Sequence, residues 1–419
     1  ALKKQRNRDL TEIRGLRDKH RRTYGASRDP HALSSRFVRV AKSFNVIVGM
    51  GGATISSIPD MARTMMVEGF KTTYEHGLRN QFRANSARLK ALNMKELRAS
   101  GVAADALLGL RASAFADIGD IFGNRFAVER AIGQSVGVMF VINGLNVWNQ
   151  FLKEFAGTVT SLRMNEAIMK NWSDLSKADK EKLLKNGIDQ QSAERMQALI
   201  RQHGEVVDGN YMPNTELWED AAMRQMYRSA LNQNVNRIIV TPGAGDRALW
   251  TSTEFGSLLT QFKSFGQAAT MRVLISGLQE KDSNFWLGSF FLISLAGMVN
   301  EIKRIQYGID KQESFDEKLV NAFERSGIGG YFMDVNNAVE KLSDYGFGMR
   351  PLLTDQRSYP VPMGAKLGAV AGPAGSNFVN VLDVAKDVLG GNVSQDTMDT
   401  LKFITPYSSL PGVGNALDA

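Results

Sequence analysis

The sequence lacks cysteine and is poor in histidine. None of its 419 residues is a cysteine, which excludes disulfide bonds, thiolate metal sites and cysteine nucleophiles in this chain. Only four histidines occur, so there is little material for metal binding or acid–base catalysis. Six of the ten prolines follow residue 350, which concentrates helix-breaking residues near the C-terminal end. With 43% hydrophobic residues, however, the chain is too apolar to be disordered throughout.

An excess of positive charge is also missing outside the first 42 residues. The formal net charge is +8, yet residues 1–42 alone hold 13 basic and 4 acidic side chains, and the other 377 positions hold 38 basic and 39 acidic ones. A basic terminal segment of this kind is typical of an arm that contacts nucleic acid or anionic lipid, and a solvated helix face is the alternative. The side chains expected to make this contact are Lys3, Lys4, Arg6, Arg8, Arg14, Arg17, Lys19, Arg21 and Arg22.

The same basic segment has a narrow apolar stripe and no apolar leader. Leu2, Leu10, Ile13 and Leu16 recur at helical spacing, so one side can dock while the others face water or phosphate. The basic start is followed by more charge, which predicts that no secretory leader is present. The first residue, Ala1, opens directly into a charged helical pattern without a cap, as expected after removal of an initiator Met or for a segment of a longer polypeptide.

Helix signals predominate in the remainder of the chain. Ser176 and Asp179 form a capping-box pattern before residues 180–185, and residues 190–203 repeat the pattern with Gly204 as the stop. From 216 to 240, apolar residues recur at three- and four-residue intervals, and no run of strict alternation is long enough to indicate a sheet. We therefore predict an all-α fold, an elongated multi-helix assembly of helical hairpins with a loop-rich C-terminal portion.

Composition divides the chain into four regions. The first, 1–42, is the basic helical arm, and the second, 43–205, is a helical region with glycine-broken apolar segments. The third, 206–310, contains a long helix, a short Gln-Phe-Lys-Ser-Phe motif and an apolar helix. The fourth, 311–419, is expected to be helical to loop-rich, because most of the prolines lie there.

Four windows lack charge altogether: 43–59, 131–152, 283–300 and 367–382. The first is broken by glycines, the second carries amides that favour a bundle interior, and the last contains Pro373. The strongest membrane candidate is 285–299, which at 15 residues is short for a full span, so a buried core helix and an interfacial segment are both open. The side chains of this segment that are expected to contact either the membrane or the core of a ring are Phe285, Trp286, Leu287, Phe290, Phe291, Leu292, Ile293 and Leu295.

Motifs for catalysis are weak. Gly133-Gln-Ser135-Val-Gly137 matches a nucleophile elbow, but the residues before it are helical in pattern and His203 is the only histidine after it. Gly49-Met-Gly51-Gly52 resembles half of a dinucleotide fingerprint, and a glycine-rich helix break explains it better. We expect no catalytic residue, no metal site and no cofactor in this chain.

One short motif resembles a known family. Thr260-Gln261-Phe262-Lys263-Ser264-Phe265, which precedes the apolar helix at Phe285, is similar to the Gln-Phe-Lys-Ser-Phe signature in the C-terminal region of the large internal virion protein of short-tailed podovirus phages. The turn within 190–209, the helix 216–228 and the charged N-terminal helix followed by 44–59 occur in the same order as in that family. Residues Gln261, Phe262, Lys263, Ser264 and Phe265 are therefore taken as the family motif, a packing or assembly element.

The resemblance implies a specific role. Internal core, or DNA-ejection, proteins of this family form rings inside the capsid above the portal and are expelled through the tail at infection. They then form a conduit for DNA across the host periplasm and inner membrane. The implied partners are further copies in a homo-oligomeric ring, other internal virion proteins of the portal-proximal core, the phage double-stranded DNA without sequence specificity, and the host inner membrane.

Two other hypotheses stay open. Some family members carry a lytic transglycosylase domain, so the chain could belong to a peptidoglycan-degrading virion enzyme whose activity lies elsewhere in a longer parent polypeptide. This sequence has no counterpart of that domain's catalytic glutamate followed by a Gly-Leu-Met-Gln type motif, so the activity is not assigned to it. The third hypothesis is a helical scaffold or portal-associated protein that never contacts lipid.

Overall fold

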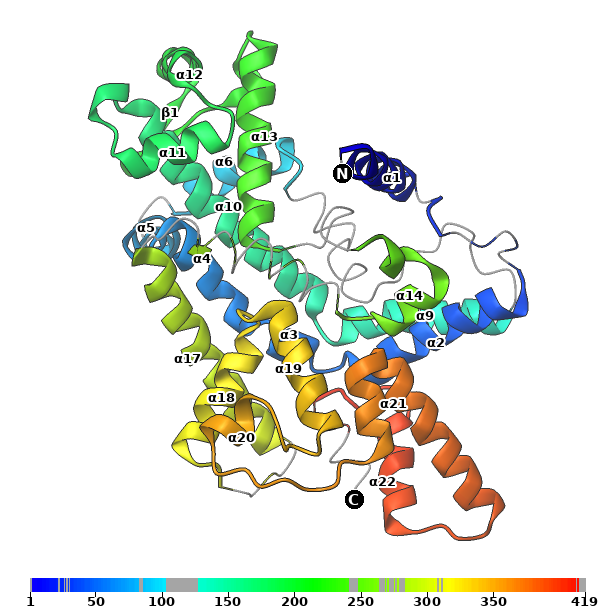
Figure 1. Ribbon diagram of the computed structural model, residues 1–419. Coiled ribbons are helices and arrows are strands. Elements are labelled where there is room, and N and C mark those ends of the chain that lie inside the picture. The colour runs from blue at the N-terminus through cyan, green and yellow to red at the C-terminus, as the bar shows by residue number, and fades with distance from the viewer. Residues whose placement is uncertain are drawn as a thin grey trace.

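The computed structural model describes residues 2–21, 23–25, 27, 29, 31–82, 86–102, 127–240, 248–263, 268, 270, 275, 277–278, 283–306, 309, 312–411 and 413. Helix makes up 77% of the structure and strand 2%, with packed helix pairs, so the predicted all-α fold is confirmed. Figure 1 shows an upper group of helices around α10 and α13, a lower group around α17–α22, and α2 and α9 between them.

The N-terminal part consists of one long isolated helix followed by many shorter ones. Their bounds are α1 Leu2–His20, α2 Leu33–Gly49, α3 Ala53–Ser56, η1 Ile58–Asp60, α4 Met61–Glu68, α5 Phe70–Thr72, η2 Thr73–Leu78, η3 Arg79–Phe82 and α6 Ser86–Ala99. The glycine-rich segment 49–52 separates α2 from α3, as the sequence predicts. Helix α2 continues through position 42, where the basic arm was expected to end.

The upper group surrounds the long helix α10. Its elements are α9 Ala127–Ile142, α10 Leu145–Met169, η4 Trp172–Asp174, α11 Lys177–Lys185, α12 Gln190–His203, β1 Glu205–Val207, β2 Asn210–Met212, η5 Thr215–Leu217 and α13 Ala221–Ile238. Helix α10 packs against α6, α12 and α13, and the largest hydrophobic cluster lies between them, with Leu152, Met196 and Tyr227 fully buried. This group therefore has a conventional apolar core.

Local capping explains where these helices begin and end. Ser176 accepts a hydrogen bond from the Asp179 amide at the start of α11, and α12 covers 190–203, both as predicted. The helix expected from 216 instead begins at Ala221, because the Asp220 carboxylate accepts hydrogen bonds from the amides of Ala222 and Met223. The apolar spacing before it belongs to the separate turn η5.

A two-stranded antiparallel hairpin, β1–β2, was not expected from the sequence. Val206 pairs with Tyr211, and the two strands are joined by Asp208 and Gly209, which both have positive φ values (50° and 79°). An Asp-Gly pair with this backbone is the preferred two-residue turn of a β-hairpin. The signal was present in the sequence, but each strand has only three residues and shows no alternation long enough to detect.

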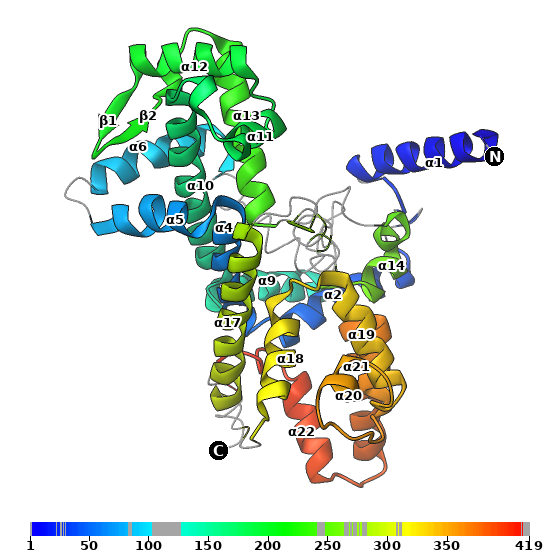
Figure 2. The same cartoon turned by 60° about the vertical axis from the view of Figure 1, so that its left-hand side comes forward.

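Helix α17 starts beside α4 near the middle of the molecule and runs toward the lower end next to α18 (Figure 2). The short elements η7 Leu249–Ser252 and α14 Glu254–Leu259 come before α17 in the chain and contact α1 and α2, respectively. The lower group consists of α17 Ser283–Gln306, α18 Phe315–Ser326, α19 Gly330–Leu342, α20 Met349–Leu353, α21 Met363–Leu389 and α22 Gln395–Ile404. Gly288 lets α17 approach α4 closely, since a Cβ there would lie 2.6 Å from the Met66 backbone nitrogen.

The C-terminal region contains one long loop, 354–362, and is otherwise largely helical up to 404. Pro373 lies inside α21, where Gly372 has φ 64° and ψ −163° and divides the helix into two arms. The last described segment returns to the N-terminal half of the chain. The Tyr407 amide donates to the Ile47 carbonyl (3.1 Å), and the Gly51 amide donates to Ser409 Oγ (2.9 Å).

Candidate functional surfaces

Helix α1 stands apart from the rest of the molecule (Figure 2). Gly15 is its one buried residue among those described, and a Cβ there would lie 2.6 Å from Leu249 Cδ1. The predicted contact residues Lys3, Lys4, Arg6, Arg8, Arg14, Arg17 and Arg21 are exposed, Lys19 is half-buried, and Arg22 lies outside the described residues. Arg8 forms an ion pair with Glu12 (3.3 Å), and Arg17 forms one with Asp18 (2.7 Å). The arm thus presents its charge to solvent.

Helix α17 has two different apolar faces. Phe285 and Leu292 are buried in a cluster with Ala62 and Met66 of α4, and the partly buried Phe291 and Leu295 pack against this cluster. Ile293 is half-buried, whereas Trp286 is 62% exposed, Phe290 is 64% exposed and Leu287 also faces solvent. One face of α17 is therefore a buried core face, and the opposite face carries apolar side chains that are open to solvent. The core-helix and the interfacial-segment predictions each describe one of these two faces.

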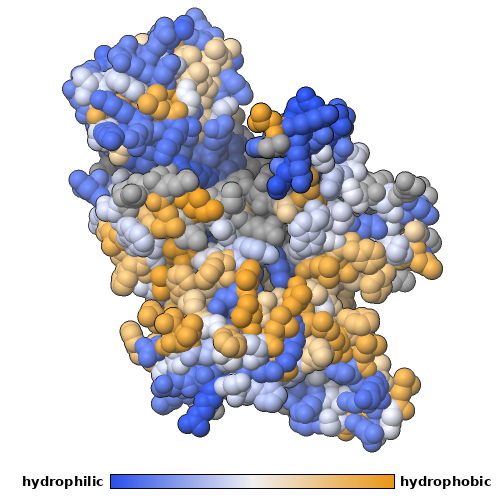
Figure 3. All heavy atoms as spheres, in the orientation of Figure 1, coloured by the Kyte–Doolittle hydropathy of each residue, from blue (hydrophilic) through white to orange (hydrophobic). Residues whose placement is uncertain are grey.

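The open face of α17 continues toward its C-terminal end. Met298, Ile302 and Ile305 are exposed and follow Trp286 and Phe290 at helical spacing, with Ser294 and Glu301 as polar interruptions. Ser283–Gln306 is the one single helix among the described residues that is long and apolar enough to cross a membrane, and 39% of its most apolar 18-residue window is buried. Figure 3 shows hydrophobic residues gathered across the middle of this face of the molecule, in contrast to the hydrophilic α1.

A second apolar element lies at the corner between α9 and α10. The two helices would pass the same test together, but they bend by 52° at the break. Asn143 stabilises this corner, because its side chain donates to the Met50 carbonyl (2.9 Å) and accepts from the Leu145 amide (2.9 Å). Buried Asn143 and Asn149 fit the predicted bundle interior, whereas the exposed Val141, Ile142 and Val147 were not anticipated. Ser135 lies within α9, where its hydroxyl donates to the Ala131 carbonyl.

The first residue of the family motif, Gln261, is a fully buried hydrogen-bonding link. Its amide nitrogen donates to the Lys42 carbonyl (2.9 Å), and Asn45 Nδ2 donates to Gln261 Oε1 (2.8 Å). Asn377 of α21 in turn donates to Asn45 Oδ1 (2.8 Å). This chain of amides connects α2, the segment after α14, and α21, which are far apart in sequence.

The next two motif residues also serve packing. Phe262 has φ 68° and packs against the cluster that contains Val46, Phe140 and Leu145. Lys263 Nζ donates to the Ala369 carbonyl (2.9 Å), at the end of the first arm of α21. Burial lowers the pKa of Lys263, and burial raises the pKa of neighbouring Asp334 to about 6 although Lys263 opposes that rise. Ser264 and Phe265 lie outside the described residues.

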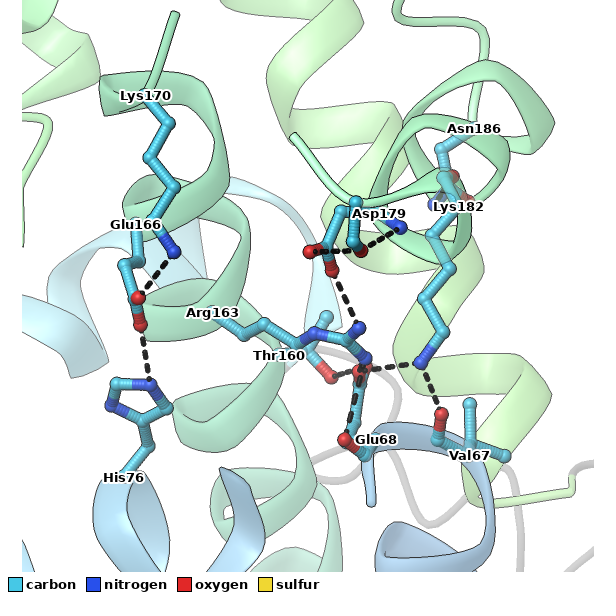
Figure 4. Close-up of polar contacts among 11 residues, drawn as sticks. Val67, Glu68, His76, Thr160, Arg163, Glu166, Lys170, Asp179, Lys182 and Asn186 are labelled. Carbon is cyan, nitrogen blue, oxygen red and sulfur yellow. Dashed lines mark hydrogen bonds and ion pairs between the residues drawn. The ribbon is translucent and has the colours of Figure 1, made fainter. Parts of the chain in front are cut away.

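A buried ionic cluster joins α4 to α10 and α11 (Figure 4). Glu68 receives Arg163 Nη1 (2.6 Å), Thr160 Oγ1 (3.0 Å) and Lys182 Nζ (3.4 Å). Arg163 also contacts Asp179 (2.7 Å). Burial alone would raise the pKa of Glu68, but the charges of Lys182 and Arg163 with these hydrogen bonds outweigh it and lower the pKa to about 2. No pattern in the sequence marked these residues, whose positions are separated by up to 114.

The helices α18–α20 are joined by polar links. Arg350 forms ion pairs with Glu340 (2.6 Å) and with Glu324, and Asn337 donates to Glu324 (2.6 Å). Apolar side chains of the same helices face outward, including Phe332, Val335, Val339 and Leu342 of α19. In a water-soluble bundle, apolar side chains usually point inward and polar side chains outward. Over part of α18–α20, polar side chains join the helices and apolar side chains are exposed.

No group of three or more His, Asp or Glu side chains suited to a metal ion occurs within the part of the chain that the structure describes. No family model, curated protein or solved structure matches the chain. The functional argument therefore depends on the surfaces described above.

Proposed function

We propose that this chain is an internal core protein of a short-tailed phage virion. It is expelled at infection and helps to form a DNA-translocating conduit across the host envelope, where the open face of α17 contacts the inner membrane. The observation that carries the proposal is that open face: a helix of membrane-spanning length turns a row of large apolar side chains toward solvent. The proposal assigns no catalysis to these residues.

The energetic argument starts from the six exposed apolar side chains of that face. Transfer of apolar surface from water yields about 25 cal/mol per Å², so each half- to mostly exposed side chain contributes roughly 1 kcal/mol on entering an interface. Their sum is several kcal/mol, which is sufficient for reversible membrane association. Because the opposite face is occupied by α4 and α18, this conformation favours a helix lying on the bilayer, and a full crossing requires α17 to leave its neighbours.

Charge distribution is compatible with a conduit for DNA. Outside the first 42 residues, basic and acidic side chains nearly balance, so a channel built from this part of the chain would hold few phosphates tightly. Each phosphate neutralised strengthens binding and slows release, which would oppose passage of a genome. The motif residues Gln261, Phe262 and Lys263 contribute through packing, in accordance with an assembly element.

The test is flotation of the purified chain with neutral phosphatidylcholine vesicles, which isolates apolar contact from charge. We expect the wild-type chain to float with the vesicles, and the double variant Trp286→Gln, Phe290→Gln to lose at least about tenfold in vesicle affinity, the equivalent of about 1.4 kcal/mol. Both residues are mostly exposed, so the variant should keep its helical circular dichroism.

The matched control is Val206→Gln with Leu184→Gln, which removes two exposed apolar side chains from the upper group. This control should float like the wild type. Failure of the wild-type chain to float, or equal loss in both double variants, would refute the membrane contact and favour a scaffold that never meets lipid. Release of a trapped dye from the vesicles reports whether the bound chain also opens a path.

A further inference from the structure

The hairpin formed by the second arm of α21 and by α22 projects from the lower end of the molecule (Figures 1 and 2). Within residues 374–404, Asn377 and Thr397 are the buried side chains. A hydrogen bond from Thr397 Oγ1 to Asp387 (2.6 Å) joins the two helices. The exposed apolar side chains are Phe378, Val381, Leu382, Val388, Leu389, Val393, Met398, Leu401 and Phe403.

This much apolar surface on a thin hairpin indicates an interaction site. Leu389 at the tip is 88% exposed. The two helices have no apolar core of their own, and a helical hairpin depends on such packing for its stability. A partner that covers the hairpin would supply the missing burial.

The charge of the hairpin restricts the chemistry of that partner. Residues 374–404 hold four aspartates and two lysines. Asp383 and Asp396 form no ion pair within the described residues. An acidic surface repels DNA phosphates and anionic lipid headgroups, so a basic protein surface with apolar side chains is the complementary partner.

Helix α1 has those properties. On a helical wheel, Leu2, Leu10, Ile13 and Leu16 lie on the side of α1 opposite to Gly15, the residue that contacts the body. Arg6 and Arg17 lie among these apolar residues, and Lys3 and Arg14 lie along one edge of the stripe. A 19-residue helix with one buried residue is marginal in water, so α1 also requires a partner for its stability. DNA phosphates would leave the apolar stripe uncovered.

The two surfaces cannot meet within one molecule in this conformation. Both views place α1 in the upper part and the α21–α22 hairpin at the bottom (Figures 1 and 2). We therefore propose that α1 of one copy docks along the α21–α22 hairpin of the next copy. Such a head-to-tail contact is heterologous and generates a ring when the rotation closes. The inference rests on the oligomeric ring of the proposed function and names the contact that builds it.

The test is charge reversal read out by sedimentation at low salt. The arm variant carries Arg6→Glu and Arg14→Glu, and the hairpin variant carries Asp383→Lys and Asp396→Lys. We expect the wild-type chain to self-associate, and each variant to associate at least about tenfold more weakly, because like charges then face each other. A chain with all four changes, and an equimolar mixture of the two variants, should both recover association.

The control variant Glu181→Lys, Glu194→Lys reverses two acidic residues on α11 and α12 and should associate like the wild type. A monomeric wild-type chain at about 100 µM, or loss without recovery in the fourfold variant, would overturn the proposal. Unchanged association in the arm variant would also overturn the proposal. If the arm variant then lost salt-dependent DNA binding, or flotation with anionic vesicles, α1 would be assigned to contact with DNA or with anionic lipid, respectively. Flotation with neutral vesicles tests α17 separately and should not change in either charge variant.

Discussion

Replacement of Glu68 by Gln offers the sharpest test of how the upper and lower helix groups are joined. Glu68 ends α4, the helix on which α17 packs, and its carboxylate contacts Arg163 of α10 and Lys182 of α11. The Gln side chain keeps the volume and one carbonyl acceptor but removes the negative charge. Two partly buried cations then lose their shared partner, although Arg163 keeps Asp179.

The magnitude follows from the pKa of Glu68. A pKa lowered from 4.5 to about 2 corresponds to on the order of 3 kcal/mol of stability when the carboxylate is ionised. Because the folded-state pKa lies below the unfolded value, this stability is complete well above pH 4.5 and is lost as the pH falls toward 2. Between pH 7 and pH 3, about 2 kcal/mol of it should disappear.

The assay is chemical denaturation of wild type and Glu68→Gln at pH 7, 5 and 3. We expect the variant to be less stable by on the order of 3 kcal/mol at pH 7, with the gap shrinking to roughly 1 kcal/mol at pH 3. Glu181→Gln removes an exposed partner of Lys177 (4.0 Å) and should change stability by less than about 0.5 kcal/mol. A gap between wild type and Glu68→Gln that is small, or that does not depend on pH, would show that the ionic cluster does not stabilise the fold.

Two further predictions concern packing and titration. Gly288→Val should destabilise the chain by at least about 2 kcal/mol, since the added carbons meet the Met66 backbone. The control Gly297→Ala should be nearly neutral, because its added Cβ makes an ordinary 3.4 Å contact with Ala322. Thermal melts compare the two variants, and equal effects would contradict the close approach of α17 to α4. Asp334→Asn should raise the melting temperature at pH 8 and leave it unchanged at pH 4. Burial raises the pKa of Asp334 to about 6, so ionisation of this side chain above that pH opposes folding. A stabilisation by Asp334→Asn that does not depend on pH would contradict this reasoning.

Local signals predicted the helices well and their partners poorly. The cap at Ser176 and the helix 190–203 depend on a few neighbouring residues, and both lie where expected. Asp220 is an equally good cap, but apolar residues before it at helical spacing concealed the break. The Asp208-Gly209 turn was detectable from its two residues, while its three-residue strands were too short to show a period.

The functional surfaces required tertiary information. Helical spacing separates Trp286 and Phe290 from Leu292, but only the contact with α4 decides which of these faces is buried. The motif residue Gln261 binds Asn45, which lies 216 positions before it in the chain. Asn45 also binds Asn377, which lies 332 positions after Asn45. No local pattern in the sequence predicts hydrogen bonds between residues so far apart. The exposed apolar residues of α21 and α22 look like ordinary core positions in the sequence, because core and interface surfaces share one composition.

The return of the C-terminal segment to α2 has a consequence for synthesis of the chain. The hydrogen bond between Gly51 and Ser409 spans 358 positions, and Tyr407 completes the cluster that also contains Val46 and Phe262. The buried members of this cluster lie at or before position 145, but during translation Tyr407 can cover them only after almost the whole chain has left the ribosome. The α10–α13 core needs only residues made earlier. A ribosome-bound chain stopped before position 405 should therefore protect the α10–α13 amides from hydrogen exchange fully, and protect the second half of α2 less than the 419-residue chain does.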